Sequence, residues 1–144
     1  MTSHSVSLIL LAFFAASVIR AEVVINEIHY DPGDNTLKAE FVEVWNPGEE
    51  GIDLSGWSLA KAVNFTFPNG TRLVAGGFLV IAEHPETTFA QYAVSALGPY
   101  EGKLSNEGER LELRDASGGL QDRVEYQARF PWPLGSAGER PRDE

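Results

Sequence analysis

Short stretches of alternating hydrophobic and polar residues recur through most of the chain, which is the pattern of β-strands that bury one face. The alternation marks candidate strands at residues 22–30, 40–45, 52–59, 63–67, 109–115 and 120–126. Residues 78–82 form a wholly apolar run, which is typical of a buried strand, and only residues 84–92 have a helical pattern. Turn residues separate these stretches, so the pattern predicts an all-β sandwich of about seven to eight strands.

Residues 40–59 form the centre of this pattern. Residues 40–45 are β-branched and aromatic with acids between them, which suits a half-buried strand. Asn46-Pro47-Gly48 then ends the strand, because these residues favour turn geometry. No catalytic motif occurs in the stretch, so we predict that its main role is architectural.

Local signals also predict how neighbouring elements connect. The Asn69-Gly70 dipeptide is a favoured hairpin turn, so we expect the strand before it to pair with a return strand that starts at Arg72. A proline at a first helical position, Pro85, predicts one or two helical turns. Residues 93–106 have the composition of a loop.

In the first strand, a period of two separates the side chains onto two faces. It places Asn26 and Ile28 on one face, and Ile25, Glu27 and His29 on the opposite face.

The first 21 residues differ from the rest of the chain. Residues 6–19 are almost wholly apolar, too few for a comfortable membrane span, and small residues follow them. We therefore predict a secretory signal peptide over residues 1–21, and a secreted or cell-surface protein with no other membrane segment. An uncleaved anchor is the alternative, since the start of the segment has no Lys or Arg.

Charge and cysteine content exclude several classes of protein. The chain has 21 acidic and 11 basic residues, a formal net charge of −10. It therefore lacks the basic surface that binds nucleic acid, and its charge disfavours anionic lipid. With no cysteine, it has no Cys nucleophile, Cys-bound zinc or iron–sulfur cluster.

Several short motifs follow one another in a specific order. They are VINEI (residues 24–28), EFVEVWN (40–46), DLSGWSL (53–59), FPNGT (67–71), AGGFLVIA (75–82), LSNEGE (104–109) and DRVEY (122–126). This series resembles the lamin tail domain in its bacterial, secreted form. The resemblance covers about residues 22–133, and it implies an immunoglobulin-like β-sandwich with no catalysis of its own. Residues 134–144 have little to bury and are expected to be a disordered tail.

Acids near the end of the first strand are the best candidates for metal chemistry. Glu27 and His29 project from one face of that strand, and Asp31 and Asp34 lie in the loop that follows. Carboxylates together with loop carbonyl groups suit a hard cation, so Ca²⁺ is the one cofactor considered. The spacing is not that of an EF-hand, and the alternative is a solvated acidic loop.

The strand at residues 40–45 carries the candidates for ligand contact, which are Glu40, Glu43 and Trp45. Glu40 and Glu43 fall on opposite faces, so both cannot reach one site without a bulge. Glu27 and Glu43 as a glycosidase pair would need a cleft, for which so short a sandwich has little chain. Neither His-Glu-x-x-His nor Gly-x-Ser-x-Gly occurs, and we predict that the protein is not an enzyme.

The expected function is that of a secreted module for binding, adhesion or domain spacing at the cell surface, with a protein or a cell-surface glycan as partner. The loops at residues 31–38, 48–51 and 97–106 are expected to carry recognition. One alternative is a Ca²⁺- or glycan-binding adhesion domain. Another is an accessory module truncated from an extracellular hydrolase or nuclease. An oligomeric state does not follow from the sequence.

Overall fold

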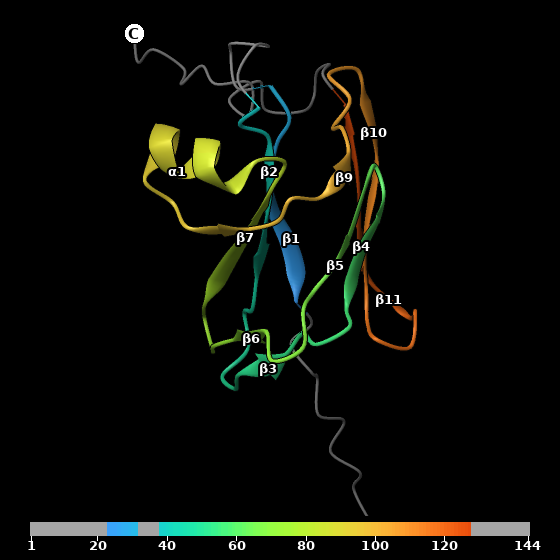
Figure 1. Cartoon of the computed structure of the whole chain (residues 1–144). Coiled ribbons are helices and arrows are strands. Elements are labelled where there is room, and N and C mark those ends of the chain that lie inside the picture. Colours follow the sequence, from blue (N-terminus) through green and yellow to red (C-terminus); the bar gives the residue numbers. More distant parts are fainter. Residues whose placement is uncertain (1–22, 32–37, 128–144) are drawn as a thin grey trace, which may run out of the picture.

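Two β-sheets pack face to face in a β-sandwich (Figure 1). The computed structural model describes residues 23–31 and 38–127, so the predicted signal peptide and C-terminal tail lie outside the described residues. One sheet has the strand order β1-β2-β7-β8, and the other has the order β11-β10-β4-β5-β9. A small sheet of β3 and β6 lies at one end of the sandwich (Figure 1).

Most elements follow the predicted pattern. Their bounds are β1 Val24–His29, β2 Phe41–Trp45, β3 Ile52–Asp53, β4 Ser58–Lys61, β5 Val63–Thr66, β6 Arg72–Leu73, β7 Phe78–Ala82, α1 Pro85–Tyr92, β8 Ala96–Leu97, β9 Glu101–Gly102, β10 Gly108–Arg114 and β11 Leu120–Gln127. Four of the strands have only two residues each, and the seven longer strands confirm the predicted sandwich. In the described part of the chain, no helix has the length and apolar content needed to cross a membrane.

The hydrophobic core lies between the two sheets. Alternate residues of β2 and β10 point into it, and Val42, Val44, Leu111 and Leu113 are fully buried there. Burying these aliphatic side chains away from water is the main force that holds the sheets together. At one end, Tyr30 and Tyr126 stack with ring centroids 5.2 Å apart, which joins the end of β1 to β11.

An extra residue in β1 changes the predicted assignment of side chains to faces. The register between β1 and β2 shifts between Ile25 and Glu27, so Asn26 is inserted as a β-bulge. As a result Ile25 and Ile28 are both buried in the core, although a strict period of two places them on opposite faces. That part of the sequence prediction is wrong. Glu27 and His29 still share a face, as predicted, because both follow the bulge.

Residues 93–106 are more regular than a loop. β8 pairs in parallel with β7, and β9 pairs with β5 of the other sheet, so the chain crosses between sheets at Gly98, Pro99 and Tyr100. Gly98 has a φ of 138°, and a Cβ there would collide with the Ala82 carbonyl oxygen. This crossing connects the edge strands β8 and β9 and so closes that side of the sandwich. The turn residues of this segment do not predict such a connection.

The turn at Asn69 and Gly70 forms as predicted, but it does not connect two paired strands. The Thr71 N–H donates to the Pro68 carbonyl oxygen at 3.1 Å. However, β5 pairs with β4 and β9, whereas β6 pairs with β3. The predicted hairpin is therefore wrong, because the residues after the turn pair with β3. Next to that pair, the Leu54 N–H donates to the Thr71 carbonyl oxygen at 2.8 Å.

Candidate functional site

The candidate site is the side of the four-stranded sheet that points away from the core, which we call the outer face. Strand pairing arranges its side chains in three rows across β1, β2 and β7. The apolar row holds Val24, Trp45 and Phe78, the acidic row holds Glu27, Glu43 and Val80, and the histidine row holds His29, Phe41 and Ala82. Four of the predicted site residues thus lie on one surface.

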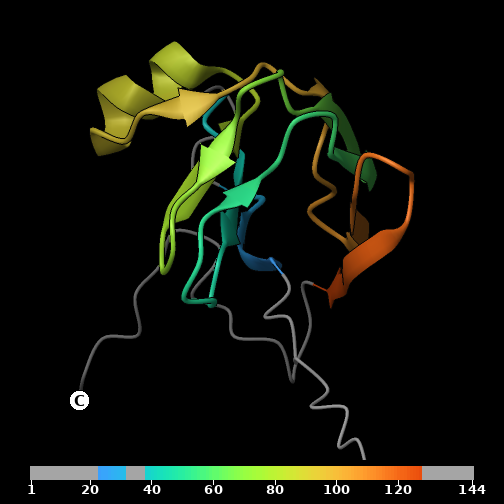
Figure 2. The same cartoon turned by 90° about the horizontal axis from the view of Figure 1, so that it is seen from below.

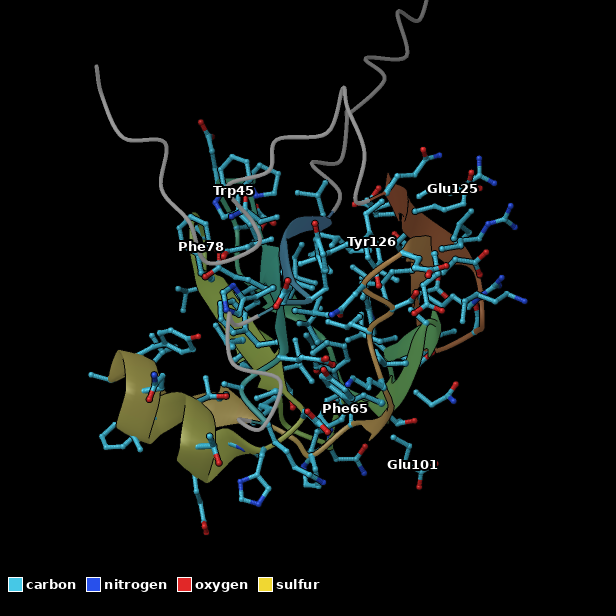
Figure 3. All side chains as sticks on the ribbon, turned by 90° about the horizontal axis from the view of Figure 1, so that it is seen from above. Trp45, Phe65, Phe78, Glu101, Glu125 and Tyr126 are labelled. Atoms are coloured by element: carbon cyan, nitrogen blue, oxygen red, sulfur yellow. The ribbon has the colours of Figure 1, made fainter. Side chains whose placement is uncertain are left out.

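Two aromatic rings dominate the apolar row. Trp45 and Phe78 are direct partners across β2 and β7, and their rings stack with centroids 5.9 Å apart at an angle of 12°. Phe78 is 56% exposed, and Trp45 is partly exposed. Figure 3 shows the two side chains next to each other, away from Tyr126 and Glu125 of the other sheet. A pair of neighbouring aromatic rings that solvent reaches is a candidate contact surface.

The acidic row brings two carboxylates together. Glu27 and Glu43 are direct partners across β1 and β2, an arrangement in which like charges destabilise a sheet. Asn26 on the bulge donates a hydrogen bond from Nδ2 to Glu43 Oε1 at 2.8 Å. Burial raises the pKa of Glu27, and the nearby charge of Glu43 raises it further. The ion pairs found within the described residues involve neither acid, so their charge is not neutralised there.

His29 is used in packing. It is buried, its ring stacks on Phe41 with centroids 4.7 Å apart, and its Nε2 lies 3.0 Å from the Tyr92 hydroxyl oxygen. Burial lowers the pKa of the His29 imidazole, and the charge of Asp31 partly opposes this effect. His29 therefore helps to hold α1 against the outer face. Two views place α1 outside the sandwich, next to β8 (Figure 1 and Figure 2).

The predicted calcium ligands are only partly covered by the structure. Glu27 and His29 lie on the outer face, and Asp31 follows β1, whereas Asp34 lies outside the described residues. Within residues 23–31 and 38–127, no three His, Asp or Glu side chains group in a way that could hold a metal ion. The calcium site that includes Asp34 stays a prediction.

We predicted Glu40 as a ligand contact, and the structure instead places it inside the fold. It is 4% exposed, on the face of the sheet opposite to Glu43. Its Oε2 accepts hydrogen bonds from the Leu104 N–H at 3.0 Å and the Tyr100 hydroxyl at 3.3 Å. Burial raises the pKa of Glu40, and the hydrogen bond from Leu104 partly opposes this rise. Glu40 therefore anchors the residues on both sides of β9, because its alternation with Val42 directs it inward.

The fully buried side chain of Asn46 holds the turn at residues 48–51 in place through hydrogen bonds. The Asn46 Nδ2 donates to the carbonyl oxygens of Glu50 at 2.8 Å and Val74 at 3.1 Å, and its Oδ1 accepts the Gly48 N–H at 3.0 Å. The side chain thus ties the turn after β2 to the turn between β6 and β7.

The other two predicted recognition loops differ in how far the structure describes them. Residues 97–106 pack against the sandwich through the buried Tyr100 and Leu104. Residues 32–37, the greater part of the first loop, lie outside the described residues.

Three residues of the candidate site were missed from the sequence: Asn26, Phe78 and Tyr92. The apolar run of β7 predicted burial for all its members, and a period of two within that run would have placed Phe78 and Val80 on one face. Asn26 directly follows the apolar run Val23-Val24-Ile25, within which alternation already fails. The position of Tyr92 beside His29 depends on how α1 docks, and no local signal encodes it.

The two packed, mainly antiparallel sheets define an immunoglobulin-like β-sandwich module. The sequence model of the Lamin Tail Domain matches residues 19–128, and the chain belongs to the lamin tail domain family. A search of curated proteins finds no match. The match confirms the resemblance that the motifs carried, and it agrees with the observed fold. Membership suggests a non-catalytic module, since this family is immunoglobulin-like and non-enzymatic.

Proposed function

We propose that the chain is a secreted, non-catalytic module that binds a partner at the cell surface. The observation that carries this proposal is the outer face, where a stacked, exposed aromatic pair lies beside two carboxylates on the sheet. A folded domain gains nothing from exposing aromatic carbon or from opposing like charges. Such a surface is expected where a partner covers it.

The buried titratable residues Glu40 and His29 have structural partners, which supports a packing role for them. The Glu40 carboxylate receives hydrogen bonds from Leu104 and Tyr100, and the His29 ring is engaged with Tyr92. A general base must instead be within hydrogen-bonding reach of a substrate. Family membership and the use of these groups in packing both favour binding over catalysis.

Secretion is tested by expressing the full chain in a secretion-competent host and sequencing the N-terminus of the protein in the medium. We expect the released protein to begin near residue 22. The matched control carries Leu10→Arg and Leu11→Arg, which interrupt the apolar segment, and it should remain in the cells. Release of both proteins to the same extent would contradict secretion through this segment.

Binding is tested with the fluorescently labelled chain on cells of the source organism. We expect saturable binding that unlabelled protein displaces and that Phe78→Ser weakens. Leu120→Ser, an exposed apolar residue on the other sheet, is the matched control and should bind like the parent protein. Hydrolase assays on the same preparation should show no turnover, and turnover that Glu43→Gln abolishes would overturn the non-catalytic assignment.

A further inference from the structure

Resting on the binding function proposed above, we infer that the outer face binds an extended polypeptide segment in which an arginine and apolar residues lie two positions apart, and therefore on one side of the segment. The apolar residues pack on Trp45 and Phe78, and a guanidinium group lies between Glu27 and Glu43. The proposal depends on three observations: the charge of the acidic row, the shape of the apolar row, and the extent of α1.

The acidic row calls for a cation. Glu27 and Glu43 are opposed across two strands, and Asn26 supplies one neutral hydrogen bond to Glu43. Within the described residues the ion pairs are made by other acids, namely Glu40, Glu112 and Glu125. A cation placed between the two carboxylates would relieve their repulsion, and a planar guanidinium can donate to both.

The apolar row favours a side chain over a sugar ring. Trp45 and Phe78 are nearly parallel, at 12°, with ring centroids 5.9 Å apart. The indole, on which a sugar would stack, is the less exposed of the two rings, so the pair offers an apolar ridge with Phe78 as its more exposed part. Neighbouring rows on one face of a strand lie roughly 6.6 Å apart, which matches the alternate side chains of an extended peptide.

The net charge of the protein narrows the class of partner. At −10 the chain repels nucleic acid and anionic lipid, and a second copy would bring acids against acids. A cationic segment is attracted both by the whole molecule and by the acidic row. Charge complementarity therefore selects a basic polypeptide among the partners that could cover an apolar surface.

The helix limits the docking surface to two rows. Tyr92 of α1 contacts His29 and Phe41, with ring centroids 5.4 Å and 5.9 Å away, and so covers the histidine row. Val80 of the acidic row is buried as well, so a bound segment would cross the apolar row and the part of the acidic row formed by Glu27 and Glu43, and stop at Tyr92.

The test uses nuclear magnetic resonance on the ¹⁵N-labelled full chain. The probes are the peptide acetyl-LSRSL-amide, in which the arginine and both leucines share one side, its acidic counterpart acetyl-LSESL-amide, and chitohexaose as a neutral glycan. We expect the basic peptide to shift the backbone signals of Glu27, Glu43, Trp45 and Phe78, and we expect the other two probes to leave them unchanged.

Charge removal distinguishes the acidic row from general acidity. The double variant Glu27→Gln with Glu43→Gln should weaken binding of the basic peptide about tenfold, the loss of about 1.4 kcal/mol. The matched control, Glu101→Gln with Glu107→Gln, removes the same charge from exposed positions elsewhere and should change the affinity less than about twofold. Dispersed spectra will show that the variants fold, and removing the opposed charges should not reduce stability.

Three results would overturn the inference. They are equal losses in the two double variants, chitohexaose shifts at Trp45 and Phe78, and peptide shifts confined to residues 48–51 or 97–106. None of them would contradict the proposed function, which fails instead if the parent protein shows no saturable binding to cells. An inference that fails is thereby distinguishable from a function that fails.

Discussion

The side chain of Asp122 in β11 accepts a hydrogen bond at Oδ2 from the backbone N–H of Ile25 in β1, 97 residues away, with a separation of 2.7 Å. β1 and β11 are the terminal strands of the two sheets on the same side of the sandwich. Asp122 stands where the alternation of Leu120, Val124 and Tyr126 would place an apolar residue. In the structure it satisfies an N–H at the edge of the first strand, and it links the two sheets where no backbone ladder joins them.

Replacing Asp122 should therefore loosen this edge. We expect Asp122→Ala to lower the free energy of unfolding by about 1–2 kcal/mol, because the partly buried Ile25 N–H loses its acceptor. Asp122→Asn keeps an acceptor oxygen, so its free energy of unfolding should fall by less than that of Asp122→Ala. Urea unfolding measures the change, and hydrogen exchange at Ile25 should speed up in the Ala variant. Unchanged exchange at Ile25 would refute the role of this contact.

Asn46 should be among the most sensitive positions. Asn46→Ala is expected to cost about 2–4 kcal/mol, since it removes the buried side chain and leaves the partly buried carbonyl groups of Glu50 and Val74 and the Gly48 N–H without this partner. Asn46→Asp has the same shape but lacks the Nδ2 donor, so it should be at least as destabilising near pH 7. The control is Asn64→Ala on the exposed face of β5, which should change stability by less than about 0.5 kcal/mol.

The burial of Glu40 predicts that the stability difference between the parent protein and Glu40→Gln depends on pH. Burial raises the pKa of Glu40 above 4.5, so the folded state holds this proton more tightly than the unfolded chain. The associated stability is fully present below pH 4.5 and is lost as pH rises through the folded pKa. Glu40→Gln, which mimics the protonated acid, should therefore gain stability relative to the parent protein as pH rises.

Urea unfolding of both proteins between about pH 4 and pH 7 measures this difference. Glu125→Gln, at an exposed position, is the control and should show a smaller trend. A difference that shrinks as pH rises would mean that the hydrogen bond from Leu104 outweighs burial.

The burial of His29 predicts the opposite dependence of stability on pH: its contribution is lost on acidification, whereas that of Glu40 is lost as pH rises. Burial lowers the pKa of the imidazole below 6.5, so the unfolded chain takes up a proton more readily than the folded state. The stability that neutral His29 contributes is present above pH 6.5 and falls as pH drops from 6.5 through the folded pKa. His29→Phe keeps the stacking on Phe41 and removes the titration, so the parent protein should lose stability relative to this variant on acidification.

Thermal unfolding of the two proteins between about pH 5 and pH 8 provides the measurement. His84→Phe is the control, because His84 is an exposed residue before α1 and should show little of this trend. Parallel curves for the parent protein and His29→Phe would contradict the expected linkage.

The candidate site was partly predictable. Alternation placed Glu43 and Trp45 on one face of β2 and Glu40 on the other, and the structure has them so. Alternation could not assign the faces inward and outward, and Glu40, chosen as a surface contact, is buried with Leu104. The stack of Trp45 on Phe78 joins residues that are distant in the sequence, so only the pairing of β2 with β7 reveals it.

The sequence by itself determined the family, the all-β class and the position of most strands, because these depend on local periodicity and turn residues. Tertiary structure decided what local patterns do not encode. The bulge at Asn26 depends on the register between β1 and β2, and the Asn69-Gly70 turn fails to make a hairpin because β6 finds a better partner in β3. The outer face likewise exists only once three strands align, since strand pairing sets which side chains become neighbours.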